Sequence, residues 1–177
     1  MWRFIIPIGL FATLAVFLFI GLGRDKEWLP SPLLGKPAPL FELPRVDDPS
    51  KKISNREFAG RPYVVNIWGS WCVACREEHE ALMEIARRGE VPVIGLNWKD
   101  ELPLAQRWLQ VLGDPYVVSA FDPEGSVGID WGAYGAPETF LVDARGIIVY
   151  KYVSPMRIDV WEREFLPRIK QGGVKGE

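Results

Sequence analysis

The sequence contains few side chains that can bind a metal or form a cross-link. Among 177 residues there are two cysteines and one histidine. Two cysteines form one disulfide at most, which excludes a fold held together by a disulfide framework. A zinc site of cysteine and histidine would need all three of these side chains and a carboxylate besides. We therefore expect neither a metal centre nor another cofactor.

An excess of charge of one sign is also missing. Lys and Arg total 21 and Asp and Glu total 23, which gives a net charge of −2. This balance excludes the basic surface that binding to nucleic acid requires. Hydrophobic residues make up 48% of the chain, which excludes intrinsic disorder. The length leaves room for one ordinary domain and an appendage.

One long hydrophobic run stands out at the N-terminus. Residues 4–22 contain no charged side chain, and a charged group at 24–27 follows directly. As a helix this run would be roughly 28 Å long, close to the thickness of a bilayer core. A cleaved signal peptide is the alternative, but its apolar region is usually about 7–15 residues long. We therefore expect an N-terminal transmembrane helix, with residues 1–22 as an uncleaved membrane anchor.

Residues 23–39 are expected to form a tether, because four prolines favour extended backbone there. Positive charge does not decide the orientation of the anchor, since Arg3 precedes the apolar run and Arg24 and Lys26 follow it. The remainder, residues 40–177, is expected to form a single domain.

Strand and helix patterns alternate along this domain, which indicates an α/β fold. The sequence YVVNIW at 63–68 is typical of a buried central strand. A capping box at 54–57 predicts the start of a short helix. The other strands are expected at 40–43, 91–96, 139–142 and 147–153, and the other helices at 102–112 and 157–169.

The strongest motif is a Cys-x-x-Cys pair, Cys72 and Cys75, directly after the strand expected at 63–68. This junction places the first cysteine at a helix N-terminus, where free N–H groups favour the thiolate that attacks a disulfide. The second cysteine lies one turn further on and can resolve the mixed disulfide. A purely structural disulfide is the alternative. Haem attachment is excluded, because Arg76 stands where a histidine would be needed.

The helix expected after this pair brings Glu78 onto the same face as Cys75, Leu82 and Ile85. If that face is buried, the pKa of Glu78 rises and the carboxylate can accept a proton from its neighbour. Periodicity leaves equally open that Glu78 lies at the boundary and reaches solvent. The lone histidine, His79, is expected to be a surface or hydrogen-bonded residue without a catalytic role.

These motifs together resemble a known family. The segments are residues 68–79 (WGSWCVACREEH), 97–100 (NWKD) and 134–143 (YGAPETFLVD). They are similar to those of the membrane-anchored thiol:disulfide interchange proteins of cytochrome c maturation, the DsbE/CcmG type. The resemblance implies a thioredoxin fold, in which helices flank a central mixed β-sheet.

The resemblance also implies residue roles. Cys72 would be the nucleophile and Cys75 the resolving cysteine of a redox-active disulfide, with Glu78 as a catalytic acid–base group. Pro137 matches the proline that thioredoxin-fold proteins hold in cis beside the pair, although a trans proline opening a strand would also suit the sequence. The substrate groove would comprise Trp71, Ala136, Pro137 and Glu138.

The function implied is that of a reductase in the periplasm, anchored in the inner membrane. Its partners would be apocytochrome c, or a thiol protein of the same pathway, and a membrane thiol carrier that supplies electrons. A TlpA- or ResA-like reductase with another client and a non-catalytic docking module are the alternatives. The sequence shows no sign of an oligomer, so we expect a monomer.

Overall fold

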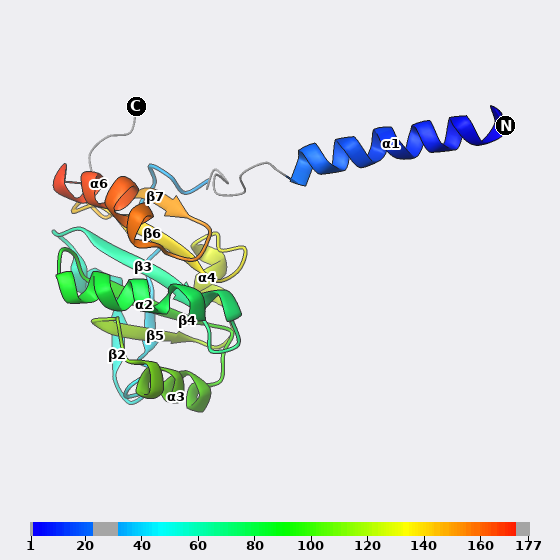
Figure 1. Cartoon of the computed structure of the whole chain (residues 1–177). Coiled ribbons are helices and arrows are strands. Elements are labelled where there is room, and N and C mark those ends of the chain that lie inside the picture. The colour runs from blue at the N-terminus through cyan, green and yellow to red at the C-terminus, as the bar shows by residue number, and fades with distance from the viewer. Residues whose placement is uncertain (1, 23–31, 173–177) are drawn as a thin grey trace.

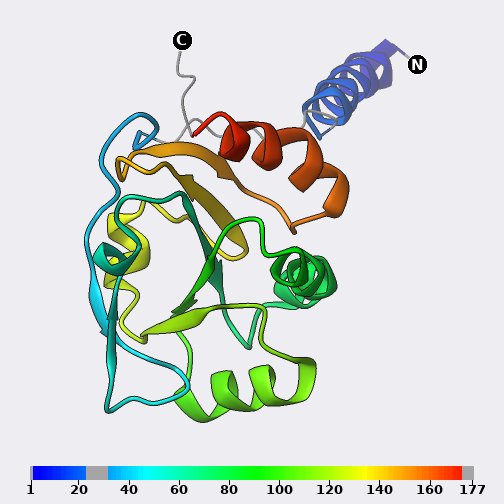
Figure 2. The ribbon, with the colours of Figure 1, turned by 90° about the vertical axis from the view of Figure 1, so that its left-hand side faces the viewer.

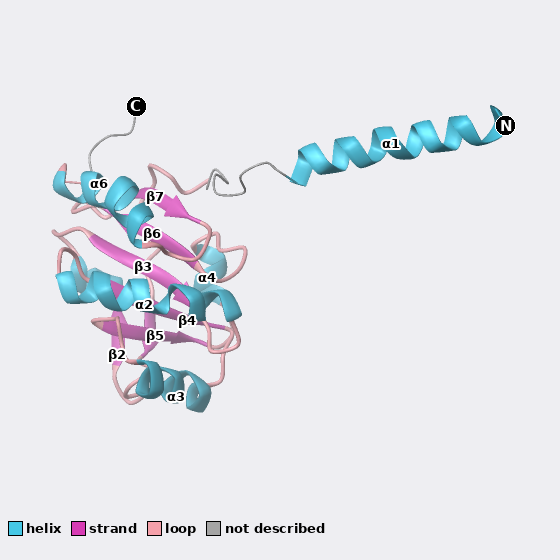
Figure 3. Cartoon of the chain, in the orientation of Figure 1, coloured by secondary structure: helices cyan, strands magenta, loops and turns pink. Residues whose placement is uncertain are grey.

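A computed structural model of the chain describes residues 2–22 and 32–172. Its centre is a five-stranded mixed sheet, drawn as magenta arrows in Figure 3. The middle strand pairs in parallel with one neighbour and antiparallel with the other. In spatial order the strands are β5 (Val118–Asp122), β4 (Val93–Trp98), β3 (Tyr63–Trp68), β6 (Glu138–Val142) and β7 (Ile148–Tyr152).

Strand β3 is central because it can be buried on both faces. All six of its side chains are buried, and most are β-branched or aromatic. A strand covered on both sides needs such a nearly continuous apolar run. Asn66 is the exception, a polar side chain with no exposed surface. Because β3 is packed on both faces, its C-terminal end holds the Cys72–Cys75 motif in a fixed position.

Two layers cover the sheet, and Figure 2 shows them on opposite sides of it. One layer contains α2 (Val73–Arg88), α3 (Leu102–Leu112) and the C-terminal helical segment, whose apolar side chains share a core with one sheet face. The other contains a β-hairpin and two short helices. Their bounds are β1 (Glu42–Pro44), β2 (Lys52–Ser54), η1 (Asn55–Phe58) and α4 (Ser126–Asp130).

The helix expected at 157–169 is present but irregular. It consists of α5 (Ile158–Val160), a π-helical turn η2 (Trp161–Phe165) and α6 (Leu166–Lys170). Pro167 lacks an N–H group and cannot donate to the carbonyl group four residues earlier. This missing donor accounts for the change from the i→i−4 hydrogen bonds of an α-helix to the i→i−5 bonds of the π-helical turn.

The predicted fold class is confirmed for the sheet and its covering helices. The strand at 63–68 and the helix at 102–112 have the predicted bounds, whereas the strand expected at 91–96 begins two residues later. Strands β2 and β5 and helix α4 were not predicted. The first expected strand, 40–43, is displaced to β1 because it pairs with β2 in a hairpin.

The predicted tether ends earlier than residue 39. The N–H groups of Gly35 and Ala38 donate to the carbonyl oxygens of Ile148 and Gly146, each at 2.8 Å. Pro37 also forms a β-bridge with Ile147, so this segment belongs to the domain. Residues 23–31 lie outside the described residues.

The N-terminal segment forms a helix, α1 (Trp2–Leu22), visible at the end marked N in Figure 1. Within the part of the chain that the structure describes, no helix meets the length and apolarity needed to cross a membrane.

We expect the contact between α2 and the sheet to contribute strongly to stability. Leu82 on α2 is buried in this core. Leu82→Ala should lower the free energy of unfolding by about 2–5 kcal/mol, because it leaves a cavity. Urea unfolding of the oxidised chain measures this change. Glu80→Ala, on the exposed side of the same helix, is the matched control and should change the value by less than about 0.5 kcal/mol.

Candidate active site

The two cysteines form a disulfide at the junction of β3 and α2. Their Cα atoms are 5.3 Å apart, a normal separation for a disulfide. Cys72 is the N-cap of α2, and its Sγ accepts a hydrogen bond from the N–H of Cys75 at 3.1 Å. The sequence-based placement of Cys72 at a helix N-terminus is therefore confirmed. Once reduced, Cys72 would have N–H groups of the first helical turn available to stabilise a thiolate.

The loop before Cys72 is fixed by the segment that follows β4. Asp100 accepts hydrogen bonds from the N–H and the hydroxyl group of Ser70, both at 2.6 Å. The indole N–H of Trp71 donates to the carbonyl oxygen of Trp98 at 3.2 Å. Gly69 is required for this arrangement, because a Cβ there would lie 2.5 Å from the Trp71 ring. Trp71 is thereby held half-exposed beside the disulfide.

The segment before β6 approaches the disulfide from the other side. The Ala136–Pro137 peptide bond is cis, as the resemblance implies. The carbonyl oxygen of Ala136 lies 3.4 Å from Cys72 Sγ. A cavity of about 300 Å³ runs along this segment between Tyr134 and Ser154. The structure thus brings together Cys72, Ala136 and Pro137 as expected.

Glu138 borders the same cavity, but its carboxylate faces inward. The side chain is 1% exposed and forms an ion pair with Lys151 at 2.8 Å. Its Oε1 accepts hydrogen bonds from the N–H groups of Tyr134 and Gly135. The expected groove residue therefore fixes the backbone of the groove, and its carboxylate is not open to a bound chain.

Glu78 is fully buried, which resolves the alternative left open by periodicity. Its Oε1 accepts a hydrogen bond from the Asn66 amide at 2.9 Å, and its Oε2 accepts one from the N–H of Met156 at 2.7 Å. Asn66 is oriented in turn by Tyr116, whose hydroxyl group donates to Asn66 Oδ1, and by Thr139. One carboxyl group thus connects α2, β3 and the segment after β7.

Burial has a direct effect on the protonation of this group. Loss of hydration raises the pKa of Glu78 from 4.5 to about 7, although the two hydrogen bonds from Met156 and Asn66 act in the opposite direction. The carboxyl group therefore exchanges protons near neutral pH. It lies one helical turn from Cys75.

His79 is a buried, hydrogen-bonded residue and not part of the site. Its Nε2 lies 3.1 Å and 3.2 Å from the carbonyl oxygens of Gly113 and Leu112 at the end of α3.

Three residues of the site were not predicted from the sequence: Tyr116, Lys151 and Asp100. They reach the site only through side-chain hydrogen bonds or ion pairs between distant segments, for which the sequence offers no periodic signal.

Comparisons with known proteins agree with this geometry. A family model described as Redoxin matches residues 33–164. The thiol:disulfide interchange protein DsbE of Allochromatium vinosum is 51% identical, over 97% of this chain and 96% of that protein. The DsbE of Pseudomonas aeruginosa is 44% identical, over 94% of this chain and 92% of its own.

The chain belongs to the DsbE group of the redoxin family. Its Cys72–Cys75 disulfide is therefore the redox pair of a thiol:disulfide interchange protein.

Solved structures show the same fold at lower sequence identity. A secreted thiol-disulfide isomerase from Corynebacterium glutamicum superposes with a TM-score of 0.70 at 20% identity, covering 84% of this chain and 94% of that one. A DsbF homologue from Corynebacterium diphtheriae gives a TM-score of 0.67 at 21% identity, covering 80% of this chain and 92% of that one. The thioredoxin-like arrangement thus holds in distant proteins.

The buried carboxyl group predicts a dependence of stability on pH in this DsbE-group chain. The folded state holds the Glu78 proton up to about pH 7, whereas the ordinary pKa is 4.5. Between these values the folded state binds more protons at Glu78, so the contribution of this group to stability is fully present below about pH 4.5 and is lost as pH rises to about 7. This contribution amounts to about 3 kcal/mol.

Glu78→Gln should remove this component and leave a flatter profile between pH 5 and 8. Urea unfolding of the oxidised protein at several pH values measures the effect. Glu80→Gln, an exposed position on the same helix, is the control and should keep the wild-type slope. An equal slope in Glu78→Gln would show that Glu78 titrates normally.

Proposed function

We propose that this protein is a periplasmic reductase of c-type cytochrome maturation, which reduces the disulfide of the haem-binding site in apocytochrome c. The reduction is direct or passes through a partner thiol protein. The observation that carries the proposal is the Cys72–Cys75 redox pair in a chain 51% identical to a DsbE protein over nearly its full length. Haem attachment needs reduced cysteines, and an oxidising compartment tends to join them.

The reduction proceeds by two thiol–disulfide exchanges. In the first, the Cys72 thiolate attacks one sulfur of the substrate disulfide, forms a mixed disulfide and releases the other sulfur as a thiolate, which takes up a proton. In the second, the Cys75 thiolate attacks Cys72 Sγ, which closes the disulfide seen here and releases the second substrate thiolate. Two electrons pass from the protein to the substrate in each turnover.

Glu78 supplies the base that the second step needs. Cys75 must lose its proton before it attacks, and the Glu78 carboxylate, one turn away, takes that proton. Its pKa of about 7 suits this transfer, because a base works best when its pKa is near the working pH. The buried negative charge also disfavours a nearby thiolate, which makes the dithiol a better electron donor.

The substrate chain lies in a groove between Trp71 and the Ala136–Pro137 segment. The exposed ring of Trp71 and the cavity beside Pro137 offer apolar surface on both sides of Cys72. Glu138 contributes by holding the N–H groups of Tyr134 and Gly135, which shapes one wall of this groove.

The proposal places the chain in the inner membrane. Residues 4–22 carry no charge and serve as the membrane-spanning part of an anchor over residues 1–22. The segment 23–39 links this anchor to the domain at 40–177, apart from the few residues packed against β7. The N-terminus lies in the cytoplasm and the domain in the periplasm. A membrane thiol carrier returns electrons to the oxidised pair, and the protein acts as a monomer.

Replacing both cysteines tests whether catalysis is needed. Cells that carry Cys72→Ala with Cys75→Ala should lose assembled c-type cytochromes under oxidising growth conditions, as measured by haem staining. The control Val73→Ala, an exposed residue within the motif, should keep them. Normal assembly in the double variant would favour a non-catalytic docking module. Loss of another reduced client, with cytochromes intact, would favour a TlpA- or ResA-like reductase.

The reduction potential separates a reductase from an oxidase. Equilibration of the protein with a glutathione series should give a value well below that of strong oxidants, because Glu78 disfavours the thiolate. A reduction potential of about −120 mV, which is typical of a strong oxidase, would contradict the proposed direction of electron transfer.

A further inference from the structure

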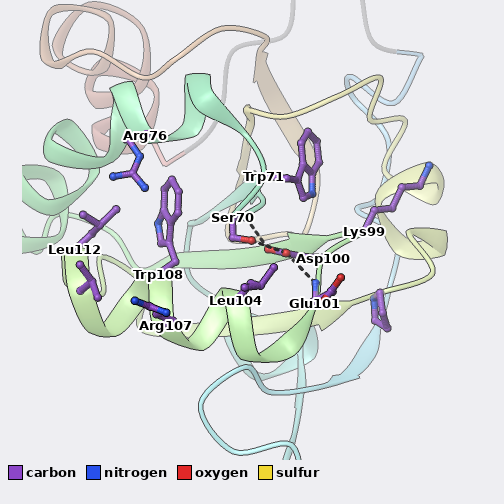
Figure 4. A pocket seen from close by; sticks show the side chains of 12 residues that line it. Ser70, Trp71, Arg76, Lys99, Asp100, Glu101, Leu104, Arg107, Trp108 and Leu112 are labelled. Atoms are coloured by element: carbon purple, nitrogen blue, oxygen red, sulfur yellow. Dashed lines mark hydrogen bonds between the residues drawn. The ribbon is translucent and has the colours of Figure 1, made fainter.

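A second cavity lies on the α3 side of the disulfide, away from the cis-proline segment. It has a volume of about 520 Å³. It borders the loop between β3 and Cys72 (residues 69–71, the redox loop), the segment after β4 and one face of α3. Figure 4 shows Trp71 on one wall and Trp108 on the other, with the Ser70–Asp100 hydrogen bonds between them. Since Trp71 directly precedes Cys72, a polypeptide bound at the disulfide has access to this cavity.

Three cationic side chains line the cavity, and each comes from a different segment: Arg76 from α2, Lys99 from the loop after β4 and Arg107 from α3. Among the described residues, none of the three has a carboxylate oxygen within ion-pair distance. The Arg76 guanidinium instead lies 4.7 Å from the centre of the Trp108 ring. In Figure 4, Arg76 and Arg107 lie on either side of Trp108.

Two acidic residues, Asp100 and Glu101, also line the cavity, and neither forms an ion pair with these cations. Asp100 uses both carboxylate oxygens on the redox loop and its own segment. It accepts two hydrogen bonds from Ser70, one from the Asn97 amide and one from the N–H of Glu101, at 2.6–2.8 Å. The Glu101 side chain is exposed at the cavity edge. The ammonium group of Lys99 lies 4.4 Å from the centre of the Trp98 ring. Because ring contacts of this kind leave N–H groups without an acceptor, Arg76 and Lys99, like Arg107, keep donors available for a ligand.

The rest of the lining is apolar. Leu104 and Val111 on α3 are exposed large side chains, as is Trp71. A guanidinium group beside apolar surface binds a carboxylate well, because its planar donors match the two oxygens and it loses little hydration. The cavity is therefore complementary to an acidic side chain that has an apolar neighbour.

We propose that this cavity binds an acidic side chain of the polypeptide whose disulfide is exchanged at Cys72. The proposal rests on the proposed function, since it names a recognition element of the same substrate. The protein as a whole carries a net charge of −2, so overall attraction does not account for a preference for an acidic substrate. The preference comes from one place on the surface, and it depends on where the acidic residue lies relative to the attacked cysteine.

A series of disulfide-closed Cys-x-x-Cys peptides tests this proposal. A single glutamate is moved along each flank of the cysteine pair, and glutamine at the same position serves as the reference. The second-order rate constant for oxidation of the reduced, detergent-solubilised full chain is measured for each peptide. At one position the rate constant for the glutamate peptide should exceed that for the glutamine peptide by about 5-fold, and at the other positions the two rate constants should differ much less.

Substitutions of the cations that line the cavity test whether they cause the preference for glutamate. Arg107→Gln and Lys99→Gln should each lower the glutamate-to-glutamine ratio toward one, and Arg107→Glu should make lysine the preferred residue at the same position. The control Arg61→Gln removes an exposed cation near Phe58, outside the cavity, and should keep the wild-type ratio.

Three outcomes would overturn the proposal. A ratio near one at every position means that the cavity does not select acidic residues. An equal preference at all positions, or one that Arg107→Glu leaves unchanged, means that charge acts only at long range. If no peptide oxidises the wild-type protein, the proposed reductase function fails, and this proposal fails with it. The first two outcomes leave that function intact.

Discussion

The buried carboxyl group of Glu78 is the constraint on which the rest of the site depends. A carboxylate without contact to water is costly unless donors surround it, and this one has an amide from β3 and a backbone N–H after β7. These partners fix how α2, with Cys72 at its N-terminus, lies against the sheet. The same burial raises the pKa of Glu78 to about 7, so one arrangement serves both packing and proton exchange.

The remaining site is assembled from loops that rigid strands hold in place. The redox loop after β3 is fastened to the segment after β4 by Asp100 and Trp98. The cis-proline segment before β6 is fastened by Glu138, whose charge is balanced by the buried Lys151. The ends of β3, β4 and β6 therefore position the walls of both cavities beside the disulfide. A disulfide that is itself nearly buried is thus flanked by two cavities whose walls are held in place.

Much of this arrangement could be predicted from the sequence, because local patterns encode it. The apolar run YVVNIW predicted β3, the Cys-x-x-Cys spacing predicted the redox pair, and the 3.6-residue period placed Glu78 with Cys75. What remained open depended on distant contacts. Periodicity could not say whether Glu78 reaches solvent, because the covering group, Met156, lies 78 residues away. Glu138 borders the cavity beside Pro137, but the sequence could not show that its partner Lys151 on β7 turns the carboxylate inward.

The central claim, that Glu78 exchanges the proton of the redox pair, is tested most directly by the pH dependence of thiol reactivity in the reduced protein. Alkylation rates of Cys72 in the wild type and in Glu78→Gln, measured from pH 5 to 10, give this dependence. The wild type should show an inflection near pH 7 from Glu78 in addition to that of the thiol, since interacting groups titrate as a pair. Glu78→Gln should show the thiol inflection alone, moved to lower pH. Identical profiles would contradict the account.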